Sequence, residues 1–217
     1  MRSPLSAAAL LAALTLPAAA QEHAHDADHA AQGGGSAPAG WTVRADRGDA
    51  AGAKIESMGK GLHVTTGPAV ILYRADTDGK GPFHTLATFT QTEPSKHPEG
   101  YGLFVGGKSL DGAAQQYVYF LVRQDGSYLI KRRDGEKASD VSKGWVQHAA
   151  VKRPDAKGTA TNLLEVDNKR DPKRVAFLVN GQEVYATDAG SMALDGIVGI
   201  RANHNLDLHI EGFDVHR

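Results

Sequence analysis

The 217-residue chain contains no cysteine. This absence excludes disulfides, cysteine-ligated metal centres and lipid attachment at a cysteine, so the fold must be held by its core alone. The chain also lacks a large excess of charge of either sign: it has 24 Lys and Arg residues and 25 Asp and Glu residues, for a net charge of −1. Without a long basic run there is no electrostatic footprint for nucleic acid or for anionic membranes. We therefore expect neither a nucleic-acid partner nor membrane insertion.

Common catalytic motifs are missing as well. The sequence has no Gly-x-Ser-x-Gly, no His-Glu-x-x-His and no glycine-rich phosphate loop followed by a helix. "DTDG" at residues 76–79 resembles the start of a calcium-binding loop, but Lys80 stands where the third oxygen ligand belongs and Ala87 where the closing Glu belongs. We interpret this stretch as a turn.

The first twenty residues, "MRSPLSAAALLAALTLPAAA", have the pattern of an export signal. An early cation, Arg2, precedes an apolar run, and Ala18 and Ala20 lie three and one residues before the cleavage point. The apolar run is too short to span a bilayer. We predict cleavage near Ala20 and a periplasmic or secreted protein, and the form of the leader indicates a bacterial origin.

The next stretch, "QEHAHDADHAAQGGGSAPAG", has no apolar periodicity to bury, so it is predicted to be a mobile tail and linker. Imidazole is nevertheless a good ligand for zinc, copper or nickel. His23, His25 and His29, with Asp26 and Asp28, are therefore weak candidates for a transition-metal site in the tail. A floppy tail lacks the supporting groups that hold each ring of a fixed site.

From Trp41 onward, short apolar or alternating runs are separated by Gly, Asp, Asn and Pro, which predicts an all-β domain. The predicted organisation is a signal peptide at 1–20, a His-rich linker at 21–40 and one antiparallel two-sheet β-sandwich at 41–217. The predicted strands are 61–66, 69–74, 84–91, 101–107, 116–124, 127–133, 145–151, 161–167, 174–180, 182–187, 196–203 and 206–215. Asn-Gly at 180–181 is predicted to be a hairpin turn that fixes strand register.

Strand parity indicates which faces are buried. In "QYVYFLVR", Val118, Phe120 and Val122 share one face and are predicted to be core. The other face is predicted to point outward with its hydrogen-bonding groups; it carries Tyr117, Tyr119, Leu121 and Arg123. "GIVGIRAN" and "VAFLVN" are apolar on both faces, which predicts that part of the second face is covered, as in a layered sandwich.

The segment from "TNLLEVD" through "VAFLVNGQEV" and "GIVGI" to "FDV" resembles the closing half of a concanavalin A-like jelly roll, of the laminin G-like and 3-keto-disaccharide hydrolase-domain type. The resemblance covers about residues 41–217 and lies in strand pattern and turn residues. It implies the fold and the possibility of a structural calcium ion, with no cofactor required. It implies much less about activity, because such folds host many functions.

Two departures bear on enzymatic activity. The "DGxSLxGW"-like stretch with which domains of the hydrolase-domain type usually open is absent here. A similar stretch, "GGKSLDGAAQ" at 106–115, lies far from the start of the domain. The related glucanases use alternating carboxylates on one strand, one as nucleophile and one as acid/base. Glu165 and Asp167 share a strand face here, but Lys169 and Arg170 occupy the places where a third carboxylate would fall.

A binding role demands less of the residues. Sugars are held by aromatic faces and bidentate polar groups. The candidate ligand-binding residues are Tyr101, Tyr119, Arg123, Arg201 and Asn203. We expect an exported module that binds a glycan or cell-envelope polysaccharide. The alternatives are a glycoside hydrolase or lyase, with Glu165, Asp167 or His204 as weak acid/base candidates, and metal capture by the tail.

Overall fold

The computed structural model describes residues 37–217. The predicted signal peptide and the metal candidates His23, His25 and His29 lie outside the described residues. Within the described part, the secondary structure consists of fifteen strands and one 3₁₀ turn. The elements are β1 (Thr42–Ala45), β2 (Ala53–Met58), β3 (Gly61–Thr66), β4 (Val70–Asp78), β5 (His84–Gln91), β6 (Tyr101–Lys108), β7 (Gln116–Arg123), β8 (Ser127–Asp134), β9 (Lys137–Asp140), β10 (Val146–Gln147), β11 (Ala160–Asp167), β12 (Arg174–Val179), β13 (Gln182–Asp188), η1 (Ala189–Ser191), β14 (Ile197–Ala202) and β15 (Asp207–His216).

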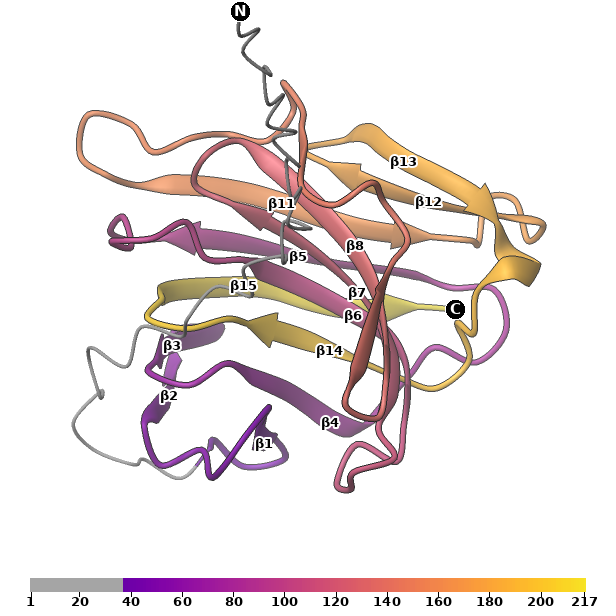
Figure 1. The fold of residues 1–217 in the computed structure, drawn as a ribbon, viewed down its shortest axis with the longest axis horizontal. Coiled ribbons are helices and arrows are strands. Elements are labelled where there is room, and N and C mark those ends of the chain that lie inside the picture. Colours follow the sequence, from indigo (N-terminus) through magenta and orange to yellow (C-terminus); the bar gives the residue numbers. More distant parts are fainter. Residues whose placement is uncertain (1–36) are drawn as a thin grey trace, which may run out of the picture.

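The strands form two antiparallel sheets stacked face to face (Figure 1). Sheet A has the order β1-β4-β14-β6-β7-β8-β10, with β9 also paired to β8. Sheet B has the order β13-β12-β11-β5-β15-β3-β2. The predicted all-β, two-sheet antiparallel sandwich is confirmed.

The main core lies between the sheets. Val118, Phe120 and Val122 of β7 face it, as their parity predicts, and Phe120 meets Phe177 of β12 edge to face with ring centroids 5.3 Å apart. Burying one such side chain contributes about 1.5–3 kcal/mol, so alternation along each strand dictates which face turns inward. β12 lies between β13 and β11, and Leu178 on its second face is buried, as its apolar residues on both faces predict.

Some boundaries differ from the prediction. β1, β2 and β9 were not predicted, because none of them has a sustained apolar alternation; all four residues of β9 are exposed. The strand predicted at 145–151 shortens to Val146–Gln147, since the chain turns where Val151 N–H donates to the carbonyl of His148 at 3.1 Å. The turn predicted at 76–79 is instead the end of β4, where the Thr77 hydroxyl donates to the carbonyl of Val198 at 2.8 Å.

The Asn-Gly hairpin is where it was predicted, between β12 and β13. Asn180 and Gly181 both have positive φ, 52° and 75°. Two successive residues with positive φ give the turn whose twist matches that of antiparallel strands. Asn tolerates this conformation at low cost and Gly at none, which explains the pair.

Candidate functional site at the end of sheet A

The outer face of sheet A, which points away from sheet B, carries four of the five predicted ligand residues: Tyr119, Arg123, Arg201 and Asn203. Tyr101 does not belong to this face. It lies between the sheets with 0% exposure, its ring 5.7 Å from that of Phe89. Burial raises the pKa of Tyr101 to about 12. Tyr101 is a core residue and offers no surface to a ligand.

The centre of this outer face is filled by its own side chains. They form a second hydrophobic cluster, the outer cluster, in which every member is at most 7% exposed: Ile71, Phe104, Leu110, Tyr117, Tyr119, Leu121 and Leu129. The tyrosines and the leucine of β7 predicted to point outward are thus covered. Leu110 comes from the loop between β6 and β7, so the cover is supplied partly by a segment without strand periodicity.

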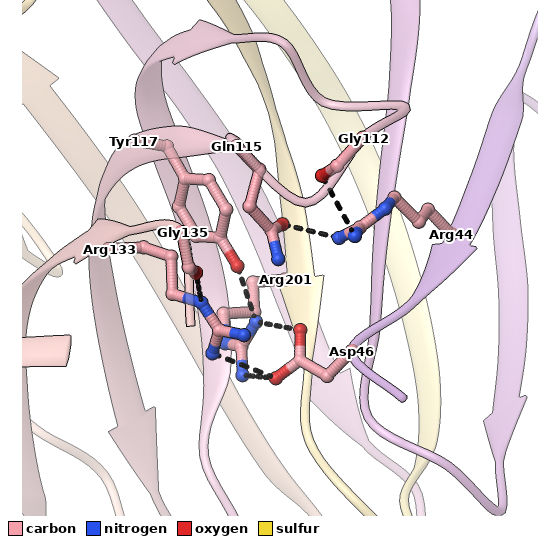
Figure 2. Close-up of polar contacts among 8 residues, drawn as sticks. All are labelled: Arg44, Asp46, Gly112, Gln115, Tyr117, Arg133, Gly135 and Arg201. Carbon is pink, nitrogen blue, oxygen red and sulfur yellow. Dashed lines mark hydrogen bonds and ion pairs between the residues drawn. The ribbon is translucent and has the colours of Figure 1, made fainter. Parts of the chain in front are cut away.

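A buried ionic network closes the outer cluster (Figure 2). Arg201 Nη1 donates to the Tyr117 hydroxyl at 2.8 Å and to Asp46 Oδ1 at 2.9 Å, while Nη2 donates to Asp46 Oδ2 at 2.6 Å. Arg133 Nη1 lies 3.7 Å from the same Oδ2. The fork-like pairing of guanidinium and carboxylate satisfies two donors with two acceptors in a fixed plane.

The charges of this network compensate one another. Burial alone would raise the pKa of Asp46, but the hydrogen bond and charge of Arg201, together with the charge of Arg133, hold that pKa below its usual value. The guanidinium of Arg201 also lies 4.8 Å from the centre of the Tyr119 ring. The structure thus brings the predicted pair Tyr119 and Arg201 together, but their polar and aromatic surfaces face partners within the protein.

A second tie anchors the loop that covers the cluster. Arg44 of β1 donates through Nη1 to the Gln115 side-chain oxygen, and through Nη2 to the carbonyl of Gly112 at 3.1 Å. Gln115 is only 2% exposed. Figure 2 shows this tie beside the ionic network, so β1 and the loop between β6 and β7 hold the cover in place together.

One end of the outer face stays open. The ladder sets Arg123 opposite Ser127, and Ser127 opposite Gln147 of β10. On the other side, the ladder sets Tyr101 of β6 opposite Val122, so the preceding residue, Gly100, lies beside Arg123. The carbonyl of Gly100 accepts from Asn203 N–H at 2.9 Å. A row across the sheet, which we call the rim row, is thus formed by Gln147, Ser127, Arg123, Gly100 and Asn203. It contains the two remaining predicted residues, Arg123 and Asn203.

Trp145 packs against the outer cluster and touches two residues of the rim row, Gly100 and Arg123. A Cβ added to Gly100 would lie 2.8 Å from the indole, so the glycine makes room for the ring. The guanidinium of Arg123 lies over the Trp145 ring, 4.2 Å from the centroid of the indole. Asp125 holds this guanidinium through contacts with Nε at 2.9 Å and Nη2 at 2.7 Å. Trp145 is partly exposed. The rim therefore has a partly exposed indole, one face of which lies against a cation.

A shallow depression of about 660 Å³, the rim pocket, adjoins the row beyond Gln147. It is lined by Gly126, Gln147, His148, Ala149, Val151, Lys152 and Arg153. Arg153 Nη2 donates to Gln147 Oε1 at 3.0 Å, and the Arg153 side chain crosses Gly126, where a Cβ would lie 2.6 Å from Nε. Glycine is favoured at this turn by its φ of +88°, a conformation that other residues rarely adopt.

Two asparagines hold the loop that lines the pocket. Asn162 is fully buried, and its Oδ1 accepts from Lys152 N–H at 2.8 Å and from Asn180 Nδ2 at 2.9 Å. Asn180 Nδ2 also donates to the carbonyl of Ala150 at 2.8 Å. The hairpin turn thus has a second role beyond register. Sequence reasoning missed the pocket; the available signal was a polar Asn162 at an inward-facing position of β11.

No protein-family model and no curated protein matches this chain. Solved structures do match its fold. The carbohydrate-binding module CBM66 from Bacillus subtilis aligns with a TM-score of 0.59 and 9% identity, over 82% of this chain and 96% of that module. The carbohydrate recognition domains of Emp46p and Emp47p align with TM-scores of 0.54 and 0.52, at 15% and 11% identity, over 82% and 83% of this chain and 88% and 89% of theirs.

The fold is the concanavalin A-like lectin and glucanase sandwich. The predicted resemblance is therefore confirmed at the level of the fold. At these identities the likeness concerns architecture alone, and the chemistry of the site must be argued from its own residues.

Of the weak acid/base candidates, Glu165 and Asp167 lie at alternate positions of β11 in this concanavalin A-like sandwich, and His204 does not meet them. Glu165 lies on the outer face of sheet B, where its Oε2 is 2.9 Å from His84 Nε2. Asp167 caps the following turn, with Oδ1 accepting from Lys169 N–H at 2.8 Å. His204 lies in the connection between β14 and β15, close to the end of sheet B at which β11 begins with Ala160. Asp167 lies at the opposite end of β11. Seven residues of extended chain span roughly 23 Å.

Within residues 37–217, no group of three or more His, Asp or Glu side chains is arranged to hold a metal ion. No helix in the same part has the length and hydropathy needed to cross a lipid bilayer.

Proposed function

We propose that the protein is an exported carbohydrate-binding module that holds a glycan at the rim of sheet A. The observation that carries the proposal is the junction of an aromatic surface, Trp145, with a polar pocket along one row of the sheet. Sugars present an apolar ring face and a set of hydroxyl groups, and this junction offers a partner for each. The match to a carbohydrate-binding module along 96% of that module's length supports it.

The two parts of the outer face have different roles in this proposal. Tyr119 and Arg201, enclosed in the outer cluster, form a rigid floor. Arg123 and Asn203, on the rim row, lie where a ligand reaches them. Among the described residues, Asn203 Oδ1 has no hydrogen-bond partner although it is shielded from water. Because this oxygen is shielded even from water, the part of Asn203 open to a ligand is not Oδ1.

Binding without turnover fits the arrangement better than glycoside cleavage. Hydrolysis needs two carboxyl groups flanking the scissile bond, about 5–10 Å apart. The rim pocket is lined by an amide, an imidazole, two cations and small residues. Export with residues 1–20 as a signal would bring the module to the polysaccharides of the cell envelope or of the surroundings.

Two exposed glutamines provide a matched test. Gln147→Ala removes a side chain of the rim pocket, and Gln182→Ala removes the same side chain from β13 of sheet B. On a glycan array, we expect the wild-type protein and Gln182→Ala to retain the same glycans, and Gln147→Ala to lose about tenfold in affinity. No reducing sugar should be released. Equal retention by both variants, or product formation, would contradict the proposal.

A further inference from the structure

We infer that the rim pocket binds a sugar that carries a carboxylate, such as a uronic acid residue; this inference rests on the proposed glycan-binding function. The charge of the pocket is the first observation. Its lining includes Lys152 and Arg153 and no acidic residue. Both residues are exposed, so their charged groups are accessible to an anionic ligand.

Two carboxylates lie close to the pocket residues in the sequence. Asp125, next to the pocket residue Gly126, accepts from Arg123 Nη2 at 2.7 Å and from the Ser127 hydroxyl at 2.5 Å. Asp155, two residues after Arg153, accepts from the backbone N–H of Lys157 at 2.8 Å. Asp125 is paired with Arg123, and neither acid belongs to the pocket lining, which contains two cations and no carboxylate.

Two donors of the pocket have defined contacts within the protein. Arg153 is an exposed residue whose guanidinium donates to the Gln147 side chain and whose chain passes over Gly126. His148 Nδ1 accepts from Ala150 N–H at 3.1 Å, so the ring proton of neutral His148 is on Nε2, which is a donor. Its ring packs edge to face on Tyr128, with centroids 6.3 Å apart.

A planar guanidinium matches a carboxylate better than it matches a hydroxyl, because two parallel N–H groups meet two oxygens. The loop that presents it is tied down by Asn162 and Asn180. A ligand therefore does not have to order the loop, which lowers the entropic cost of binding. The volume of about 660 Å³ is in the range of small-ligand sites.

The test compares an oligogalacturonate with its methyl-esterified counterpart, since esterification removes the charge and keeps the sugar. By calorimetry with the full-length protein, we expect the acid form to bind at least about tenfold more tightly than the ester. Arg153→Gln should remove about tenfold of affinity for the acid form and little for the ester. Arg47→Gln, an exposed arginine near β1 at the far edge of sheet A, is the matched control and should bind like the wild type.

The outcomes separate the two proposals. Equal binding of acid and ester, or binding of neutral glycans only, overturns the carboxylate inference and leaves the glycan-binding function standing. Failure of the array to retain any glycan overturns both. Retention of sulfated sugars in preference to uronic acids overturns the choice of carboxylate. Circular dichroism of each variant shows whether it has folded.

Discussion

Arg201 illustrates what a single residue does on a covered sheet face. Its side chain is 7% exposed, yet it carries a charge that would be costly to bury alone. Asp46, Tyr117 and the ring of Tyr119 compensate that charge. Parity along β14 predicts the face of Arg201 correctly. The role does not follow from parity, because Asp46 lies 155 positions away in the sequence.

We predict that Asp46→Asn destabilises the fold by about 3 kcal/mol, because it leaves the buried Arg201 without its counter-charge. The measurement is urea unfolding at neutral pH. The double variant Asp46→Leu with Arg201→Met should recover most of this loss, since it removes both charges together. A single variant as stable as the wild type would show that Asp46 is not the partner that matters.

The same pair sets a pH dependence. Because the pKa of Asp46 is lower in the folded state than in the unfolded chain, its contribution is complete above the unfolded value, about pH 4, and is lost as the pH falls through the lower folded value. Wild-type stability should therefore decline more steeply than that of Asp46→Asn below about pH 4. Parallel curves would contradict this assignment.

At the scale of elements, sequence reasoning succeeded where burial follows a simple period. β3 and β5 were predicted with their observed ends, since each alternates along its whole length. β9 was missed because its four residues are all exposed, and β10 was overextended because His148–Val151 is apolar but turns. The rim pocket lies in that turn, so the error of the strand prediction and the missed site have the same cause.

The turn between β12 and β13 gives a test at this scale. Asn180→Gly keeps the positive φ of the turn but removes the amide that bonds to Ala150 and Asn162. We predict a loss of about 1–2 kcal/mol in stability and about tenfold in glycan affinity, because the pocket loop is no longer pinned. Unfolding curves and calorimetry measure the two effects.

Gly181→Ala is the control for the turn itself. Its φ of +75° strains any side chain, at a cost of about 1–2 kcal/mol, while the Asn180 amide stays in place. We expect this variant to be less stable but to bind glycan like the wild type. If both variants lose affinity equally, the turn geometry rather than the asparagine side chain controls the pocket.

For the whole molecule, the outer face of sheet A is divided between structure and binding. The outer cluster and its ionic network fill the centre, and the rim row with Trp145 leaves one end open. Sequence patterns predicted the sandwich and placed four of five candidate residues on this face. The sequence patterns did not distinguish the residues buried in the outer cluster from those of the rim row. The outer cluster is covered by the loop between β6 and β7 and by β1, and their contacts join residues that are distant in sequence.

The most direct test of the glycan site is a titration of the isotope-labelled full-length protein with an oligogalacturonate, followed by the amide and indole signals in NMR spectra. The account predicts that the largest shifts fall on Gly126, Gln147, His148, Arg153 and the Trp145 indole, with little change around Glu165 on sheet B. Largest shifts on the outer face of sheet B, or none at saturating sugar, would contradict it.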